Sequence, residues 1–336
     1  MGGPFDFSLN AEDRLGVLSS TAPVAEGAAS LHIDAAAVQA FAKAHGQMEA
    51  PRPDEDGLHC TFLEPRRFLN YLLALEALNF CFWDTEPRWR VPAAGGLHDG
   101  YWALAAALRR AIREDRLPLW EGEFLAELNE VQLRRMLRGS GRPPPLMEER
   151  LANLREAGRV LCSQWGGEFA NLVENCGGSA PELAQAIVRD FPSFRDEAVW
   201  RGRKVRFYKR AQICVADLAR MLPGHPLGRL RGLEQLTAFA DYKVPQVLRK
   251  EGILVPAPEL ARRMDRKEEL AAGSLEEVEL RAATIWACEW IARALASHSP
   301  AGRVAPSAAE VDYLLWSAGQ DKTGLPPYHR TRTIYY

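Results

Sequence analysis

Apolar side chains recur at helical spacing along most of the chain, and this pattern constrains the fold more than any other feature of the sequence. Between residues 65 and 78, the side chains of Phe68, Leu72 and Leu75 follow one another at i, i+4 and i+7 within a broad apolar stripe. Such a stripe is typical of a mostly buried helix. We expect this helix to run on into residues 79–83.

Serine and glutamate at a spacing of three mark two further helix starts. In the pairs Ser179–Glu182 and Ser274–Glu277, each side chain can accept a hydrogen bond from the free backbone N–H of the other. The second of these helices carries Arg281 among its polar positions. Apolar periodicity predicts additional helices at residues 101–114, 124–138, 146–164, 209–221, 233–248 and 308–317.

Strand signals are few. Residues 204–208 alternate after a turn signal at Gly202, and residues 88–91 can pair in a short hairpin. The chain has no glycine-rich nucleotide-binding motif and no internal repeat. We therefore predict a mainly α-helical fold. It consists of one compact helical domain over residues 58–336, with one or two short β hairpins, and an N-terminal extension, residues 1–57, packed at least partly on that domain.

The composition is that of a globular protein whose partner is a small molecule or another protein. Of 336 residues, 47% are hydrophobic and 26% are charged, which is enough apolar surface for a large core. Lysine and arginine number 42 and aspartate and glutamate 44, so the net charge of −2 gives no basic field for a nucleic-acid polymer. The apolar stretch Phe68–Leu75 is far shorter than the roughly 20 residues of a membrane span, and we expect no membrane association.

Cysteine and histidine usage indicates neither disulfides nor a metal site. The six cysteines form no C-x-x-C pair and several lie in apolar helical surroundings, as is typical of buried free thiols in a reducing compartment. The seven histidines are dispersed, without a pair at helical spacing. The N-terminus carries Asp6, Glu12 and Asp13 and lacks the pattern of a secretory or transit signal. We expect a cytoplasmic protein without a metal or other cofactor.

Polar groups set among aromatic residues are candidates for a ligand pocket, because a planar ligand needs stacking surface and hydrogen-bonding edges. Residues 79–84 hold three aromatic side chains at a helix end, which fits either the core or a rigid wall beside a ligand. Asp241 lies between Phe239 and Tyr242. It caps a helix, pairs with Lys243 or takes part in chemistry.

Further candidates combine charge with aromatic or apolar surroundings. Asp312 is embedded in the apolar and aromatic segment 311–316, on an exposed helix face or in a site. Lys209 and Arg210 follow an aromatic pair, where two adjacent cations can hold a phosphate or solvate a helix start. We expect the basic and aromatic tail, residues 328–336, to be tucked into the fold.

Several short motifs occur in one order between about residue 58 and the C-terminus. They are Leu78–Trp83 (LNFCFW), Gly100–Trp102 (GYW), Phe191–Asp196 (FPSFRD), Tyr208–Gln212 (YKRAQ), Phe239–Leu248 (FADYKVPQVL), Glu279–Arg281 (ELR), Asp312–Tyr313 (DY) and Tyr328–Arg330 (YHR). Taken together, this set resembles the queuosine salvage protein family, the queuosine 5′-phosphate N-glycosylase/hydrolases. The resemblance implies a mainly helical fold related to helical DNA glycosylases, and hydrolysis of queuosine 5′-phosphate to queuine and ribose 5-phosphate.

The same resemblance assigns roles position by position. It implies that the acid of the Phe-Ala-Asp-Tyr motif, Asp241, is the catalytic carboxylate. The residues implied to hold the deazaguanine base are His59, Phe239, Asp312 and Tyr313. The family often has an acid directly after the Trp of the last motif, where this chain has Ser317. One contact to the base or to its cyclopentenediol depends on that position.

The remaining substrate contacts are expected at Asn79, Trp83, Asp196 and Lys209. We expect Lys209, or else Arg210, to meet the 5′-phosphate. The N-terminal extension, residues 1–57, receives no role, and its residues 51–56 indicate a loop.

The main hypothesis is a nucleotide N-ribohydrolase of EC 3.2.2 type, a monomer that acts on a small nucleotide without a cofactor. One alternative is a DNA or RNA base-excising glycosylase, which the local cluster Arg203, Lys204, Arg206, Lys209 and Arg210 favours and the net charge disfavours. Another is a non-catalytic helical module that binds a nucleotide. A pure binder would keep its affinity for the ligand after Asp241→Asn.

Overall fold

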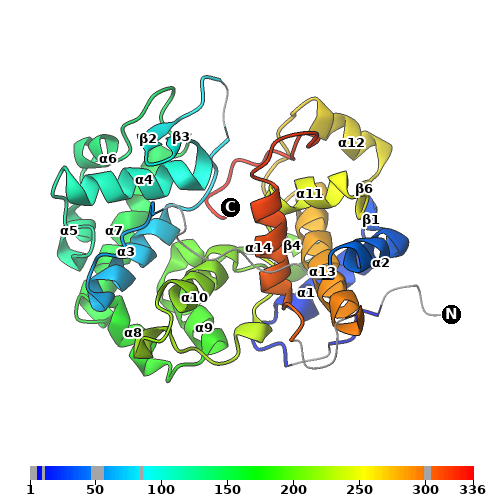
Figure 1. The fold of residues 1–336 in the computed structure, drawn as a ribbon, viewed down its shortest axis with the longest axis horizontal. Helices are drawn as coiled ribbons and strands as arrows, with labels where there is room; N and C mark the ends of the chain where they lie inside the picture. Colours follow the sequence, from blue (N-terminus) through cyan, green and yellow to red (C-terminus); the bar gives the residue numbers. More distant parts are fainter. Residues whose placement is uncertain (1–5, 10–11, 47–56, 84–85, 299–303) are drawn as a thin grey trace. The chain divides into compact units, whose positions relative to one another are not determined.

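The computed structural model describes the chain except residues 1–5, 10–11, 47–56, 84–85 and 299–303 (Figure 1). The described residues form fourteen α-helices and six short strands, and the strands pair only two by two. This confirms the predicted mainly α-helical class, while a relation to helical DNA glycosylases stays a prediction. Within the described ranges, none of the helices has both the length and the apolar character that crossing a bilayer requires.

The chain divides into two units, each assembled from separate segments. The first unit consists of Met1–Pro51, Asp196–Lys209 and Gly232–Arg332, and the second of Arg52–Arg195, Arg210–Arg231 and Thr333–Tyr336. The boundary that the sequence predicts after residue 57 stays a prediction, and the loop expected at residues 51–56 lies outside the described residues.

The first unit is built around one long buried helix. Its elements are α1 (Val17–Glu26), β1 (Leu31–Ile33), α2 (Ala35–Ala44), β4 (Glu197–Trp200), β5 (Arg203–Arg206), η3 (Leu233–Gln235), α11 (Val244–Lys250), β6 (Leu254–Pro256), α12 (Pro258–Asp265), α13 (Leu275–His298) and α14 (Ala308–Ala318). Helix α13 is buried along most of its length and packs against α1, α2, α11 and α14 (Figure 1). A helix that is apolar on nearly all sides must be covered on nearly all sides.

The second unit packs shorter helices around α3 and α7. Its elements are α3 (Pro65–Ala77), β2 (Val91–Ala93), β3 (Gly96–His98), α4 (Gly100–Arg113), α5 (Gly122–Glu127), α6 (Glu130–Met136), α7 (Met147–Gln164), α8 (Phe169–Asn175), α9 (Ala180–Asp190), η1 (Pro192–Phe194), α10 (Lys209–Met221, from its second residue) and η2 (Pro226–Gly228). Helices α5 and α7 approach closely at Gly158. A Cβ there would overlap the backbone of Gly122 and Ala126, so only glycine permits this packing.

Most of the helices predicted from periodicity are confirmed to within one residue at each end, namely α4, α7, α10 and α14. Both serines are confirmed as helix starts, but the reciprocal contact is wrong, because the N–H groups of Ser179 and Ser274 donate to the carbonyls of Cys176 and Ala271. The backbone N–H of Glu182 donates to the Ser179 hydroxyl, and that of Glu277 donates to the Ser274 hydroxyl. The hairpin of β4 and β5 turns at Gly202 as expected. From the segment 88–91, only Val91 enters a hairpin, in which β2 pairs with β3.

The expected continuation of α3 into residues 79–83 is wrong, because the helix ends at Ala77. Two buried arginines take the carbonyls at this end. Arg210 donates to the carbonyl of Ala77 at 2.9 Å, and Arg150 donates to the carbonyl of Leu78 at 2.6 Å. The arginine side chains compete with the backbone N–H groups of a further helical turn for these carbonyls, and the chain leaves the helix there.

Two other predicted helices are broken. The range 124–138 splits into α5 and α6, because the side chain of Asn129 caps the second helix in a reciprocal contact with Gln132. The range 233–248 contains only η3 and the start of α11. Between these two elements the chain is irregular, and this segment carries Asp241.

The C-terminal tail is packed as predicted. The backbone carbonyl of Arg330 accepts a hydrogen bond from Leu270 in the first unit. In the second unit, Tyr336 is 1% exposed, and its backbone oxygen accepts from the N–H of Cys81 at 2.8 Å.

Candidate active site

Asp241 lies in the irregular segment before α11, in the first unit, and its side chain is fixed by the backbone. Its Oδ1 accepts hydrogen bonds from the N–H of Lys243 at 2.7 Å and of Val244 at 2.9 Å. The capping contact considered from the sequence is therefore present. The alternative of an ion pair with Lys243 stays a prediction: that ammonium donates to the carbonyl of Gly319 at 3.1 Å, and its charge lowers the pKa of Asp241.

The surroundings of Asp241 pull its pKa in two directions. Burial raises the pKa of this carboxyl, and it is opposed by the charge of Lys209 and by the two backbone N–H groups. Oδ1 holds both of those hydrogen bonds, whereas Oδ2 accepts none from the residues that the structure describes. One oxygen is thus fixed by the fold.

A second buried acid, Asp312, comes from α14. It is 4% exposed, and its Oδ1 accepts a hydrogen bond from the backbone N–H of Phe239 at 2.9 Å. Burial raises the pKa of Asp312 well above its usual range, and the charge of Asp241 raises it further. The alternative of an exposed acid on a polar helix face is therefore wrong. Phe239 and Asp312, both expected to hold the base, are brought together by this hydrogen bond.

Tyr313 and Ser317 follow on the same helix and are both half-buried. Their spacing of four residues places them on one face of α14. The ring of Tyr313 lies 6.0 Å from that of Trp316, nearly parallel to it. The contacts of these two residues with a base stay predictions.

Lys209 is the first residue of α10 and is 5% exposed, so the alternative that it merely solvates a helix start is wrong. Its charge lowers the pKa values of Asp241 and Asp312, which brings one cation and two acids into one electrostatic cluster within the first unit. Arg210, the next residue, belongs to the second unit and uses its guanidinium on the carbonyls of Glu76, Ala77 and Ser193. Lys209 is thus the better candidate for a phosphate.

Asp196 is 1% exposed and forms a buried ion pair in the first unit. Its two carboxylate oxygens accept from Arg281 at 2.8 and 2.5 Å. The sequence pattern predicts a polar position on its helix for Arg281, but this side chain is buried as well. The signal that could have revealed it is an arginine flanked by Leu280 and Ala282, within a helix too apolar to have a broad exposed face.

The other three expected contact residues, His59, Asn79 and Trp83, belong to the second unit. His59 is 1% exposed, and its Nε2 lies 2.9 Å from the hydroxyl of Tyr101. The amide of Asn79 donates to Glu76 at 2.9 Å. Trp83 is also buried, as the core interpretation of this aromatic segment predicted. Their contacts with a substrate stay predictions.

Arg150 shapes the segment that carries Asn79 and Trp83. It is fully buried and donates to the carbonyls of Phe80 and Cys81, with its guanidinium 4.3 Å from the centre of the Phe80 ring. An arginine with its edges bonded and its face stacked holds a backbone segment in one conformation.

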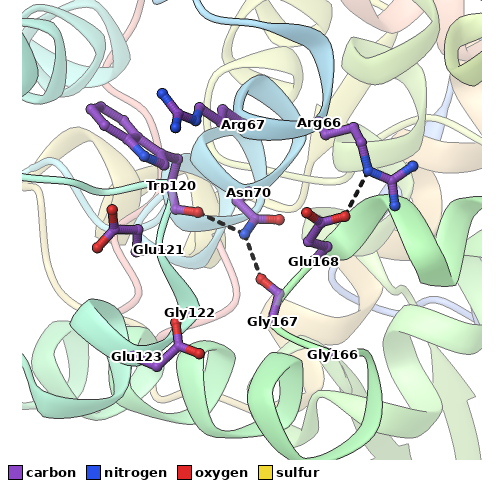
Figure 2. A pocket seen from close by; sticks show the side chains of 10 residues that line it. All are labelled: Arg66, Arg67, Asn70, Trp120, Glu121, Gly122, Glu123, Gly166, Gly167 and Glu168. Atoms are coloured by element: carbon purple, nitrogen blue, oxygen red, sulfur yellow. Dashed lines mark hydrogen bonds and ion pairs between the residues drawn. The ribbon is translucent and has the colours of Figure 1, made fainter.

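A surface cavity of about 230 Å³ in the second unit contains none of these residues (Figure 2). It is lined by Arg66, Arg67, Asn70, Trp120, Glu121, Gly122, Glu123, Gly166, Gly167 and Glu168. Figure 2 shows that some of its polar groups bond to one another, with Arg66 on Glu168 and the Asn70 amide on two backbone carbonyls. We assign it no part in the candidate active site.

Metal-ligating side chains do not gather in the described residues, where no group of three or more histidine, cysteine, aspartate or glutamate residues could hold an ion. The six cysteines are free thiols, five of them buried as expected and one, Cys162, exposed.

The structure is thus that of a mainly helical protein in which the backbone holds a buried carboxylate and the charge of a lysine lowers its pKa. Comparison with known sequences identifies the family. Residues 58–336 match the model of the queuosine salvage protein family. A protein of Sphaerobacter thermophilus is 49% identical over 96% of this chain and 98% of its own length. The chain belongs to the queuosine salvage protein family.

More distant relatives agree in name. The mouse protein is 38% identical over 80% of this chain and 82% of its own length, and the Dictyostelium discoideum protein is 34% identical over 79% and 77%. All three relatives are named queuosine 5′-phosphate N-glycosylase/hydrolase.

Proposed function

We propose that this chain hydrolyses the N-glycosidic bond of queuosine 5′-phosphate and releases queuine and ribose 5-phosphate. The family and the names of its members supply the reaction. The observation that carries the assignment to a residue is the geometry of Asp241, a buried carboxylate with one oxygen fixed by two backbone N–H groups.

Asp241 fits the charge that this reaction creates. Departure of the base leaves positive charge on C1′ and O4′ of the ribose, in a transition state that resembles an oxocarbenium ion. A carboxylate that is already held in place stabilises that charge without reorganisation, and it can also orient or deprotonate the attacking water. Oδ2 of Asp241 is the oxygen left for this task.

Departure of the base also requires stabilisation of the negative charge that develops on the base. A 7-deazaguanine has no N7 that could accept a proton, so its negative charge must be dispersed through other polar edges. Asp312 suits this role, because its raised pKa favours a neutral carboxyl that both donates and accepts. Such a group can pair with the adjacent carbonyl and N–H of a guanine-like edge. Phe239, whose backbone holds Asp312, adds a stacking surface.

The remaining assignments follow from charge and burial. Lys209 is proposed to meet the 5′-phosphate, since it is a buried cation next to the acids. Further contacts with the substrate are proposed at His59, Tyr313, Ser317, Asn79 and Trp83. Asp196, whose two oxygens are bound to Arg281, is proposed to act on the substrate only through its neighbours.

The cellular setting is proposed from the composition. A net charge of −2 favours a small nucleotide over a nucleic-acid polymer, and free thiols favour the reducing cytoplasm. We propose a monomer, which an equilibrium sedimentation measurement would check.

The test is direct. Purified protein is incubated with queuosine 5′-phosphate, and free queuine is measured by chromatography, with guanosine 5′-phosphate as the matched control. We expect queuine release and very slow release of guanine, because a buried site built for specific polar edges rejects a base that leaves them empty. Comparable turnover of both nucleotides would contradict the base contacts, and binding of the substrate without any release would favour the non-catalytic module.

A further inference from the structure

Arg281 touches the backbone segment that carries Asp241. Its Nε donates to the carbonyl of Ala240, the residue directly before Asp241, at 3.1 Å. Its other two nitrogens donate to the carboxylate of Asp196. One guanidinium therefore binds two segments of the first unit that are far apart in the sequence.

Asp196 extends this contact to Lys209. Its backbone carbonyl accepts from the N–H groups of Phe207 at 3.0 Å and of Tyr208 at 3.3 Å, and its Oδ2 accepts from the N–H of Lys209 at 3.3 Å. Tyr208 has a φ of +52°, in the left-handed region, which is costly for a bulky side chain. The segment keeps this conformation because Asp196 binds it on both sides of the turn.

The orientation of the guanidinium is itself fixed. Its central carbon lies 3.9 Å from the centre of the Phe207 ring, and Nη1 is 3.7 Å from the carboxylate of Glu277 one helical turn away. A planar cation with bonded edges and a covered face has one orientation, which the point charge of a lysine would not reproduce.

We propose that Arg281 is a positioning residue that fixes the Asp241 carboxylate relative to the Lys209 ammonium, by binding Ala240 and Asp196 at the same time. This inference rests on the function proposed above. Two charged groups lower the pKa of Asp241, Lys209 on α10 and Lys243 before α11. Two further titratable groups feel the charge of Asp241, Asp312 on α14 and Cys288 on α13. Burial raises the pKa of Asp241, and Lys209 is the charge that most opposes this, so the placement of Lys209 affects how much of the carboxylate is ionised.

The first test is Arg281→Lys, which keeps the buried charge but cannot bind Ala240 and both oxygens of Asp196 together. We expect kcat on queuosine 5′-phosphate to fall about ten- to a hundredfold, as small misplacements of catalytic groups do, with KM changed less than about threefold. We also expect the acidic limb of the kcat–pH profile to move to higher pH. An unmoved limb would overturn the proposal, whatever happens to kcat.

A second variant tests the same proposal if Arg281→Lys does not fold. Asp196→Glu keeps the ion pair with Arg281 but adds one methylene, which displaces the contact with Lys209. The same direction of change is expected in kcat and in the acidic limb. The matched control is Glu279→Asp, which changes the length of a different buried acid by one methylene. Glu279 lies on α13, and its partners are Ser30 and Trp200. Its pH profile should coincide with that of the parent.

A further readout separates this proposal from the proposed function. The ionisation of Asp241 is followed by ¹³C NMR of labelled carboxyl groups without substrate, with Asp241→Asn to assign the signal. The pKa of Asp241 should be higher in Arg281→Lys than in the parent, even if the parent releases no queuine. An unchanged titration overturns the positioning role, and so would failure of both variants to fold, which would show that the network serves the fold alone.

Discussion

Two acidic centres of the first unit differ in the groups that compensate their negative charge. Asp196 with Arg281 forms the balanced centre, and Asp241 with Asp312 forms the unbalanced centre. Asp196 gives both oxygens to one guanidinium, so its negative charge is neutralised within a pair. Asp241 is held on one oxygen by backbone N–H groups, and Asp312 by a single one. The difference shows that burial alone does not mark a catalytic acid. The acid that retains an unused oxygen and a pKa displaced by its surroundings is the one suited to act on a substrate.

The largest effect should come from breaking the balanced centre. Asp196→Ala removes the carboxylate that Arg281 binds through two nitrogens, and breaking a buried ion pair in this way costs about 3–5 kcal/mol of unfolding free energy. Urea denaturation of the variant beside the parent measures this difference. An equally stable variant would show that the pair is not balanced in the way its geometry suggests.

Asp241→Asn should produce an effect of similar size on the rate instead of on stability. Asparagine preserves size and hydrogen bonding but removes the charge that stabilises the transition state, so kcat should fall roughly a hundred- to a thousandfold. Substrate binding should remain, and the melting temperature should not fall. Queuine release in single-turnover experiments within a fewfold of the parent rate would refute the catalytic role of Asp241.

The variant Lys209→Met tests whether the Lys209 ammonium contacts the 5′-phosphate or acts only on the pKa values of Asp241 and Asp312. Loss of a charged contact of about 1.5–3 kcal/mol should slow hydrolysis of the nucleotide by roughly tenfold to a hundredfold more than that of the nucleoside. The assays belong at alkaline pH, because loss of the Lys209 charge also raises the pKa of Asp241. Equal losses on both substrates would remove Lys209 from the phosphate site.

Deleting residues 328–336 should lower stability in both units. The deletion removes His329, which is buried and whose pKa is lowered to about 3 by burial and by the charge of Arg281. It also removes Tyr336, a buried aromatic worth roughly 2 kcal/mol. Thermal unfolding monitored by circular dichroism checks this, and an unchanged melting temperature would mean that the tail contributes nothing.

The smallest effect concerns the unbalanced centre and depends on pH. The folded-state pKa of Asp312 is raised, so its contribution to stability is complete below the unfolded value and is lost as pH rises through the folded pKa. Asp312→Asn should therefore gain a few degrees in melting temperature over the parent at pH 8 and lose that advantage near pH 4. A gain that is the same at both pH values would argue against a neutral Asp312.

The sequence predicted those parts of the molecule that depend on local patterns. Helix α10 follows its apolar period, and α9 begins at the serine that announces it. Asp241 was found through its motif. Its neighbours Lys209 and Asp312 come from other elements, so their proximity depends on packing that no local pattern encodes. The pairing of β1 with β6 escaped notice for the same reason, since each strand is short and its partner is distant.

Arg281 illustrates a different limit. The start of its helix follows from a local pattern, but a charged side chain counts as polar and exposed in any periodic pattern. Its burial is tolerated because Asp196, Glu277 and Ala240 together satisfy it. Such compensation is a property of three segments at once, and the pattern of one helix does not contain it.

Helices α1 and α2 pack against helix α13, which the ribosome synthesises much later. The hydroxyl of Thr21 in α1 accepts a hydrogen bond from Trp286 in α13, 265 residues further along the chain. At synthesis rates of about 5–20 residues per second, the ribosome needs roughly 10 to 50 s to produce that partner. During this interval the apolar faces of α1 and α2 lack the helix that covers them. A nascent chain of this protein therefore exposes these apolar faces until α13 has been synthesised.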